Sequence, residues 1–264
     1  MPTPADRAAL PAWAEAVVAA LAPAGLQRWG VAPVQGAGPL PGARSALVFA
    51  SGGPGLWRGF VGAVAADHAR LRDEAHPLDA HVARLLRAAD PDPPPSRRWV
   101  RCAADEPTFV DFRPLAAAAG LGWASRLGLL LHPEDGPWIG LRAACFTTEA
   151  LPLSAPAPGP GPCAGCAAPC VSACPVGAVP AGLGARFGIG ACAAHRTTGG
   201  CPSACAARNA CPEGTASRYP PEAQAYHEDR AAGRAALAAR LGVNDDLHAG
   251  LGPPWSAWAA PSPR

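Results

Sequence analysis

The chain lacks lysine altogether and has one methionine and two tyrosines among its 264 residues, so every basic side chain other than histidine is an arginine. Charged residues make up 16% of the sequence, and the formal net charge at pH 7 is only +2. A protein that binds nucleic acid or an anionic membrane through charge normally shows a basic excess. We therefore expect no nucleic-acid partner and no membrane partner.

Long apolar runs are also missing. No stretch approaches the roughly 20 apolar residues that a membrane-spanning helix needs. The N-terminus has no basic region followed by an apolar segment, which is the pattern of a secretory signal. We therefore expect a cytoplasmic protein. Hydrophobic residues reach 49%, which suffices for the core of one large domain or of a core domain with an appended one.

Cysteine is concentrated in one part of the chain. Eight of the ten cysteines lie between Cys163 and Cys211, in two runs of four that both end in Cys-Pro. The first run reads C-x2-C-x3-C-x3-C-P, one residue longer than the bacterial ferredoxin run. The second reads C-x8-C-x3-C-x5-C-P, a weaker pattern that gains force from its position next to the first. Eight thiolates in two sets of four match the needs of two [4Fe-4S] clusters.

The last cysteine of each run is expected to cross over to the other cluster, as in two-cluster ferredoxins. One predicted set is Cys163, Cys166, Cys170 and Cys211, and the other is Cys174, Cys192, Cys201 and Cys205. Zinc is an alternative, but it usually shows paired C-x2-C hooks or Cys/His mixtures, and disulfides would need an oxidising compartment. Cys102 and Cys145 fall outside the runs, and we interpret them as packing residues.

The pattern of apolar residues predicts a mixture of helices and strands. Helices are expected over residues 7–24, 56–68, 77–89, 112–119 and 219–241. Residues 46–50 form a continuous apolar run typical of a buried strand, and a further strand begins near Trp99. Residues 127–131 and 141–146 are expected to be two strands joined by the loop 132–138.

A tract of almost only proline, alanine and glycine runs from Pro152 to Pro162 and is typical of a linker. It divides the chain into an α+β domain and a cysteine module. The predicted units are an α+β domain over 1–151, a linker over 152–162, a ferredoxin-type module over 163–216, and a C-terminal helix and tail over 217–264. The tail carries Trp255 and Trp258.

Two stretches near the middle of the chain, Arg113-Pro114-Leu115-Ala116 and Ala119-Gly120-Leu121-Gly122-Trp123, resemble the epoxyqueuosine reductases. Those are cobalamin-dependent enzymes with two [4Fe-4S] clusters. The family's catalytic Asp lies in a Val-Asp-Ser/Thr-Ala-Pro motif, which this chain lacks. Asp105, Glu106 and Asp111 are therefore candidate proton donors by family position only. The family's C-terminal helical-repeat domain, which engages transfer RNA, is not expected here, and this argues against queuosine chemistry.

A second resemblance is to the CblC-type cobalamin-processing proteins. It is carried by Leu47-Val48-Phe49, Trp57, Asp79 and His132-Pro133-x-x-Gly136-x-Trp138 followed by Leu141-Arg142. It implies a nitroreductase-like, CblC-like α+β fold in which His132, Trp138 and Arg142 line a cobalamin or flavin pocket. The residue types leave alternatives open. His132 is also typical of a bonded turn, Trp138 of a core residue, and Arg142 of a salt bridge.

These observations predict an iron–sulfur redox protein whose two [4Fe-4S] clusters take electrons from an external donor and pass them to cobalamin in the first domain. If no corrin is bound, the protein would be a ferredoxin-like carrier without catalysis that serves an acceptor protein. Less favoured alternatives are an epoxyqueuosine reductase-type enzyme and a zinc-binding interaction protein. Whether the chain is an enzyme, its substrate and its oligomeric state stay open.

Overall fold

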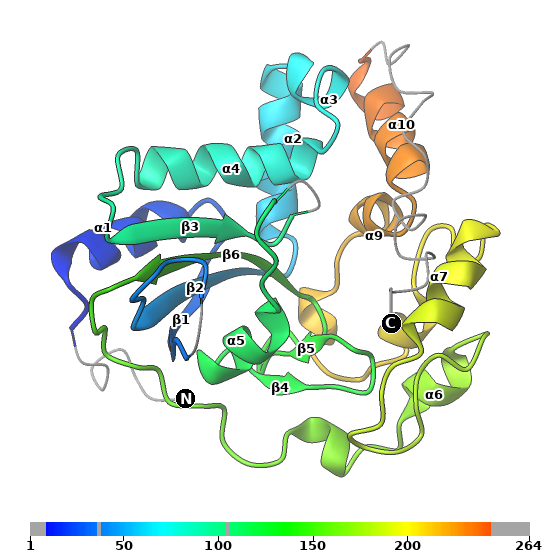
Figure 1. Ribbon diagram of the computed structural model, residues 1–264. Coiled ribbons are helices and arrows are strands. Elements are labelled where there is room, and N and C mark those ends of the chain that lie inside the picture. Colours follow the sequence, from blue (N-terminus) through cyan, green and yellow to red (C-terminus); the bar gives the residue numbers. More distant parts are fainter. Residues whose placement is uncertain (1–8, 36–37, 104–105, 244–264) are drawn as a thin grey trace.

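The fold is a mixed α/β arrangement built on a four-stranded antiparallel sheet (Figure 1). A computed structural model describes residues 9–35, 38–103 and 106–243. In spatial order, the strands are β1 (Arg28–Pro33), β2 (Ser45–Gly52), β6 (Ile139–Thr147) and β3 (Arg97–Arg101). All three neighbouring pairs are antiparallel, with a register shift between Phe49 and Ala50 where β2 meets β6.

Strand β2 is buried along its whole length because both faces of the sheet are covered. Successive side chains of a strand point to opposite faces. Leu47 and Phe49 pack with the helices α1 (Ala12–Leu21), α2 (Gly55–Ala66) and α4 (Pro77–Ala89). Ala46, Val48 and Ala50 belong to the core on the other face, which contains α5 (Phe112–Ala118). Figure 1 shows α4 above the sheet and α5 below it.

The predicted strand over 46–50 and the predicted helices over 56–68, 77–89 and 112–119 are confirmed. The predicted strand over 141–146 is confirmed as part of β6, whereas the predicted strand over 127–131 is extended at Leu130 and Leu131 alone. β5 (Leu130–Leu131) pairs with β4 (Trp123–Ala124), whereas β6 lies between β2 and β3. Residues 127–131 begin with a turn because Gly128 adopts a positive φ of 68°, which favours glycine and ends an extended run.

The proline-rich tract 152–161 contains no helix or strand, yet part of it is fastened to the sheet. The Ser154 amide donates to the Val31 carbonyl at 3.0 Å, and the Ser154 hydroxyl accepts from the Val31 amide at 2.9 Å. Further along, the Trp123 indole donates to the Gly159 carbonyl at 3.1 Å. The tract therefore follows the open edge of β1 before it enters the cysteine module.

The cysteine module consists of short helical pieces around a small core. These are η2 (Pro162–Ala164), α6 (Pro169–Ala173), α7 (Ile189–Thr197), α8 (Ala206–Asn209) and η3 (Thr215–Ser217). Its buried residues are Leu127, Leu131, Cys170, Val179, Ala207 and Cys211. Two of them come from the β4–β5 segment, so the module packs directly against the first part of the chain.

The chain then returns to the helix layer through α9 (Pro221–Glu228) and α10 (Arg230–Leu241), which contribute Tyr226 and Leu237 to its core. The single helix expected over 219–241 is wrong, because Asp229 is extended (φ −130°) and its side chain caps α10. A short helix α3 (Ala69–Arg72) completes the elements of this face. Trp255 and Trp258 lie outside the described residues. None of the helices within 9–35, 38–103 and 106–243 has the length and apolar character to cross a membrane.

Candidate functional site

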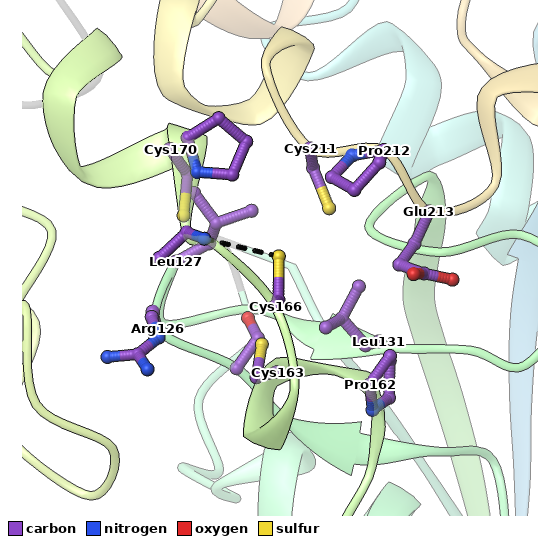
Figure 2. Close-up of a pocket in the computed structure, with 13 residues that line it drawn as sticks. Arg126, Leu127, Leu131, Pro162, Cys163, Cys166, Cys170, Cys211, Pro212 and Glu213 are labelled. Atoms are coloured by element: carbon purple, nitrogen blue, oxygen red, sulfur yellow. Dashed lines mark hydrogen bonds between the residues drawn. The ribbon is translucent and has the colours of Figure 1, made fainter.

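Four cysteines from different parts of the module stand around one cavity of about 350 Å³, measured with its opening. They are Cys163, Cys166, Cys170 and Cys211. Figure 2 shows their sulfur atoms directed toward the same space. Leu127, Leu131 and three prolines complete an apolar wall, and Glu213 and Arg126 lie at its edge. The last cysteine of the second run therefore joins the first three of the first run.

The backbone next to Cys166 is bent to point an amide at sulfur. Ala168 has a positive φ of 56°, a left-handed conformation that costs a non-glycine residue about 1 kcal/mol. Its amide donates to Cys166 Sγ at 3.3 Å (Figure 2), and α6 begins at the next residue, Pro169. Burial raises the pKa of Cys170, and the neighbouring Cys163 and Cys166 thiolates raise it further. Several thiolates that are close together and partly buried repel one another, so they need a positively charged group between them.

The remaining four cysteines of the module form a second group. Burial raises the pKa of Cys192, and so do the charges of Cys205, Cys174 and Cys201, which places these thiols near one another. Cys174 has a lowered pKa because amide hydrogen bonds, including one from Ala178 at 3.3 Å, outweigh the opposing effect of its burial. This grouping supports the predicted crossed sets, and the assignment of the eight ligands stays a prediction.

The arrangement of the first group fits a cluster better than a single metal ion. All ten cysteines are free thiols. A zinc ion with sulfur at about 2.3 Å would draw four thiolates to one point, whereas these four line the walls of a cavity. In the described part of the chain, no three His, Cys, Asp or Glu side chains are gathered tightly enough for one ion.

A second, larger cavity of about 1630 Å³, measured with its opening, lies between the sheet and the helix layer. It is bounded by the start of α4, by residues of the segments 101–103 and 106–112, and by the junction of α9 and α10. Arg142 faces it from β6, and its Nε donates to Ser51 Oγ at 3.3 Å. Glu106 also faces it, and its carboxylate accepts from the Arg101 amide at 3.2 Å. Arg142 and Glu106 are thus the two predicted site residues on this cavity.

His132 lies elsewhere, with only 4% of its surface exposed. Its Nδ1 is 3.0 Å from Asp135 Oδ2. The backbone amides of Glu134 and Asp135 each donate to the same nitrogen at 3.2 Å. Asp135 also accepts from Arg28 and from Ser217, each at 2.7 Å. This arrangement favours the bonded-turn interpretation of His132.

Trp138 is fully buried. Arg208 lies over its ring at 4.6 Å, and the ring of Tyr219 meets it edge-on at 5.5 Å. This packing favours the core interpretation of Trp138. The loop 132–138 is held against the chain after Cys211 because Gly136 and Gly214 carry no side chain. A Cβ on Gly136 would meet the Glu213 carbonyl oxygen at 2.4 Å, so the two segments touch through their backbones.

Asp111, another candidate proton donor, is not among the residues that line the large cavity. Asp111 caps α5 by accepting from the Arg113 amide at 3.2 Å and lines a different hollow with Val110. Asp105 lies outside the described residues. The N-cap role of Asp111 is the ordinary one for a carboxylate that precedes a helix.

One buried arginine connects the second cysteine group with the large cavity. Arg196 in α7 is close enough to Cys192, Cys205 and Cys201 for their charges to act on it. It forms a buried ion pair with Glu228 and donates to the His227 carbonyl at 3.4 Å. The His227 ring lines the cavity beside Arg142. Sequence reasoning missed Arg196, His227 and Arg230, because their meeting depends on the break between α9 and α10.

A mixed α/β fold with eight cysteines in two groups is an arrangement that suits an iron–sulfur redox protein. No family model matches the chain. It is 35% identical over 108 residues to an epoxyqueuosine reductase of Synechococcus sp., which covers 41% of this chain and 32% of that protein. It is 38% identical over 82 residues to the epoxyqueuosine reductase of Shewanella oneidensis, covering 29% and 20%. The chain thus spans a third or less of the length of these relatives.

Solved structures support the same fold. An epoxyqueuosine reductase from Streptococcus thermophilus superimposes with a TM-score of 0.51 at 12% identity, covering 77% of this chain and 66% of that one. An epoxyqueuosine reductase in complex with a tRNA-Tyr stem loop gives 0.50 at 17% identity, covering 80% and 69%. The expectation that a nucleic-acid partner can be excluded is therefore wrong, because the structure of a protein with this fold has been solved in complex with an RNA stem loop. Together, the matches show that part of this chain is similar in sequence to the epoxyqueuosine reductases and that the chain shares their fold.

Proposed function

We propose that the protein is an electron-transfer protein with two [4Fe-4S] clusters. Cys163, Cys166, Cys170 and Cys211 would hold one cluster, and Cys174, Cys192, Cys201 and Cys205 the other. The observation that carries the proposal is the four-thiol cavity of Figure 2, to which both cysteine runs contribute. When bound, each cluster would accept and release one electron from an external donor.

The chain's own residues set the conditions for this chemistry. Amides of Ala168 and Ala178 donate to Cys166 and Cys174, and hydrogen bonds to sulfur shift cluster potentials upward by stabilising negative charge. Arg196 adds a buried positive charge beside the second group and reaches the backbone at His227. These contacts support a route for electrons from the second cysteine group to the large cavity.

We further propose that the electron acceptor binds in the large cavity and is a corrinoid. The support is the CblC-like resemblance, with its nitroreductase-like description of the first domain, and the place of Arg142 on that cavity. The buried positions of His132 and Trp138 favour the second candidate, a carrier without a corrin that serves an acceptor protein.

Free thiols throughout the described chain support a reducing, cytoplasmic location. Epoxyqueuosine reduction itself, suggested by the relatives, is the third candidate.

Anaerobic purification followed by iron and sulfide analysis tests the first proposal. We expect about eight irons per chain, and a content of four or fewer would contradict two clusters. Titration with hydroxocobalamin tests the second proposal. A shift in the visible spectrum that is lost in Arg142→Gln but kept in His132→Gln would support a corrinoid in the large cavity. The absence of any shift would leave the carrier as the better candidate.

A further inference from the structure

Among the residues that the structure describes, the lining of the large cavity has more arginines than carboxylates. Its arginines are Arg101, Arg142 and Arg230, and its carboxylates are Asp79 and Glu106. Arg101 pairs with Glu106 at 3.5 Å, and the Arg101 amide donates to the same carboxylate. Among the described lining residues, two arginines, Arg142 and Arg230, then face the cavity together with the carboxylate of Asp79.

Neither of these two guanidinium groups has a carboxylate partner in the described part of the chain. Arg142 is half-buried and donates to the neutral hydroxyl of Ser51 at 3.3 Å. Arg230 contacts the Nδ1 atom of His76, another residue of the lining. An arginine has five N–H donors in a planar fork, so most of the donors on both side chains stay available to a ligand.

Two further features add to the positive potential. Helix α4 has 13 residues and begins at the cavity, and its N-cap residue His76 makes no capping hydrogen bond with its side chain. The N-terminal end of a helix carries a partial positive charge. Burial first, and then the charges of Arg142, Arg208 and Arg230, hold the pKa of His227 well below its ordinary value. The cavity wall therefore keeps His227 neutral while the arginines stay charged.

We propose that the large cavity contains an oxyanion subsite in which Arg142 and Arg230, with His76, bind a phosphate or carboxylate group of the ligand. Planar guanidinium groups recognise both oxyanions through paired N–H···O bonds. The inference deepens the proposed function, since it assigns a negatively charged group to whatever occupies the cavity. It does not depend on the iron–sulfur clusters.

Thermal unfolding and calorimetry of the full chain, purified anaerobically, test this subsite. The probes are inorganic phosphate and acetate, each compared with chloride at constant ionic strength. We expect wild type to be stabilised by at least one oxyanion and the affinity to fall about tenfold in Arg142→Gln and in Arg230→Gln. Arg87→Gln is the matched control, because Arg87 is exposed near the far end of α4. Equal binding by wild type and both cavity variants, or no binding at all, would overturn the inference.

A measurement on the unaltered protein guards against variants that misfold. Phenylglyoxal modifies accessible arginines, and mass spectrometry reads each site. Phosphate is expected to protect Arg142 and Arg230 at least threefold and to leave Arg87 unchanged. Unchanged labelling at the two cavity arginines would again count against the subsite. Iron content and the hydroxocobalamin spectrum are recorded on the same samples, so a failure of this inference is distinguishable from a failure of the proposed function.

Discussion

At the scale of single residues, the crossed assignment of the eight cysteines predicts which cluster is lost when one thiol is removed. Cys174 belongs to the first run in the sequence but lies near Cys192 and Cys205 of the second. Cys174→Ala and Cys192→Ala should therefore remove the same cluster, leaving about four irons and one electron paramagnetic resonance signal. Cys211→Ala and Cys163→Ala should remove the other signal.

Cys145→Ala is the control for these cysteine variants, since Cys145 is buried in the sheet core and lies in neither group. It should keep the full iron content. If Cys174→Ala instead gave the same residual signal as Cys163→Ala, the ligands would follow the two sequence runs and the crossed sets would be wrong.

Asp135 makes a pH-dependent contribution to stability. Burial alone would raise the pKa of Asp135, but hydrogen bonds from His132, Arg28 and Ser217 outweigh it and hold the pKa well below its ordinary value. A depressed pKa in the folded state stabilises the protein above the unfolded value of about 4. This contribution is lost as the pH falls below that value toward the folded pKa.

Asp135→Asn should lower the free energy of unfolding by about 3 kcal/mol at pH 7, because it removes the buried negative charge that His132, Arg28 and Ser217 surround. The difference between wild type and variant should shrink below about pH 4. Urea unfolding followed by circular dichroism measures both effects. Glu134→Gln is the control, since Glu134 is half exposed and its pair with Arg28 should contribute less than about 1 kcal/mol. A constant difference across the pH range would contradict the role of the carboxylate.

The same loop shows what a residue pattern can and cannot predict. The cysteines were identifiable because thiol spacing itself indicates cluster chemistry. His132 and Trp138 have residue types that suit either a ligand pocket or a packed loop. The packed position depends on Gly136 touching the backbone of Glu213, a contact across 77 residues that no local pattern contains. Of the three predicted pocket residues, Arg142 faces the cavity, because its side of β6 meets the α9–α10 junction.

At the scale of elements, the break between α9 and α10 positions the backbone that Arg196 contacts. The ion pair of Arg196 with Glu228 is buried on both sides, with side-chain exposures of 7% and 9%. Arg196→Met should therefore cost about 3 kcal/mol of unfolding free energy, since it removes the arginine partner of a buried carboxylate. The double variant Arg196→Met/Glu228→Met should recover part of that loss, as apolar replacements of buried pairs often do.

The matched control is Arg113→Met, because the pair of Arg113 with Asp111 is exposed by 60% and 44%. It should change stability by less than about 1 kcal/mol. Urea midpoints of the four proteins form the measurement. A double variant that is no more stable than Arg196→Met would contradict the expected recovery.

Elements with a strong apolar period were predictable, and those held by long-range pairing were not. Helices α2 and α4 each bury one apolar stripe, and strand β2 is one continuous apolar run. All three lie where the sequence pattern predicts them. Strand β1 was missed because Gly30 and Pro33 weaken its pattern. Proline is tolerated there because β1 is an edge strand of the sheet. The helix over 219–241 was overextended because Asp229, a polar residue in a helical pattern, acts as an N-cap.

At the scale of the whole molecule, the core of the helix layer and the core of the cysteine module differ in what stabilises them. The core between the sheet and α1, α2 and α4 contains large buried side chains such as Trp57, Phe60 and Trp138. The core of the cysteine module has six buried residues, of which Cys170 and Cys211 are two proposed ligands. A core this small rarely stabilises a fold without a metal or covalent link. The sheet should therefore stay folded without iron, whereas the module should not.

Hydrogen exchange with mass spectrometry tests this difference on the full chain before and after iron removal by chelator and oxidant. Amides of residues 163–217 should lose protection, because metal binding and folding of such modules are coupled. Amides of β2 and β6 should keep theirs, since their hydrogen bonds lie inside the sheet. Because Leu127 and Leu131 pack against the module, the β4–β5 segment should lose protection together with it. Loss of protection across β2 and β6 as well would mean that the clusters stabilise the chain as one cooperative unit.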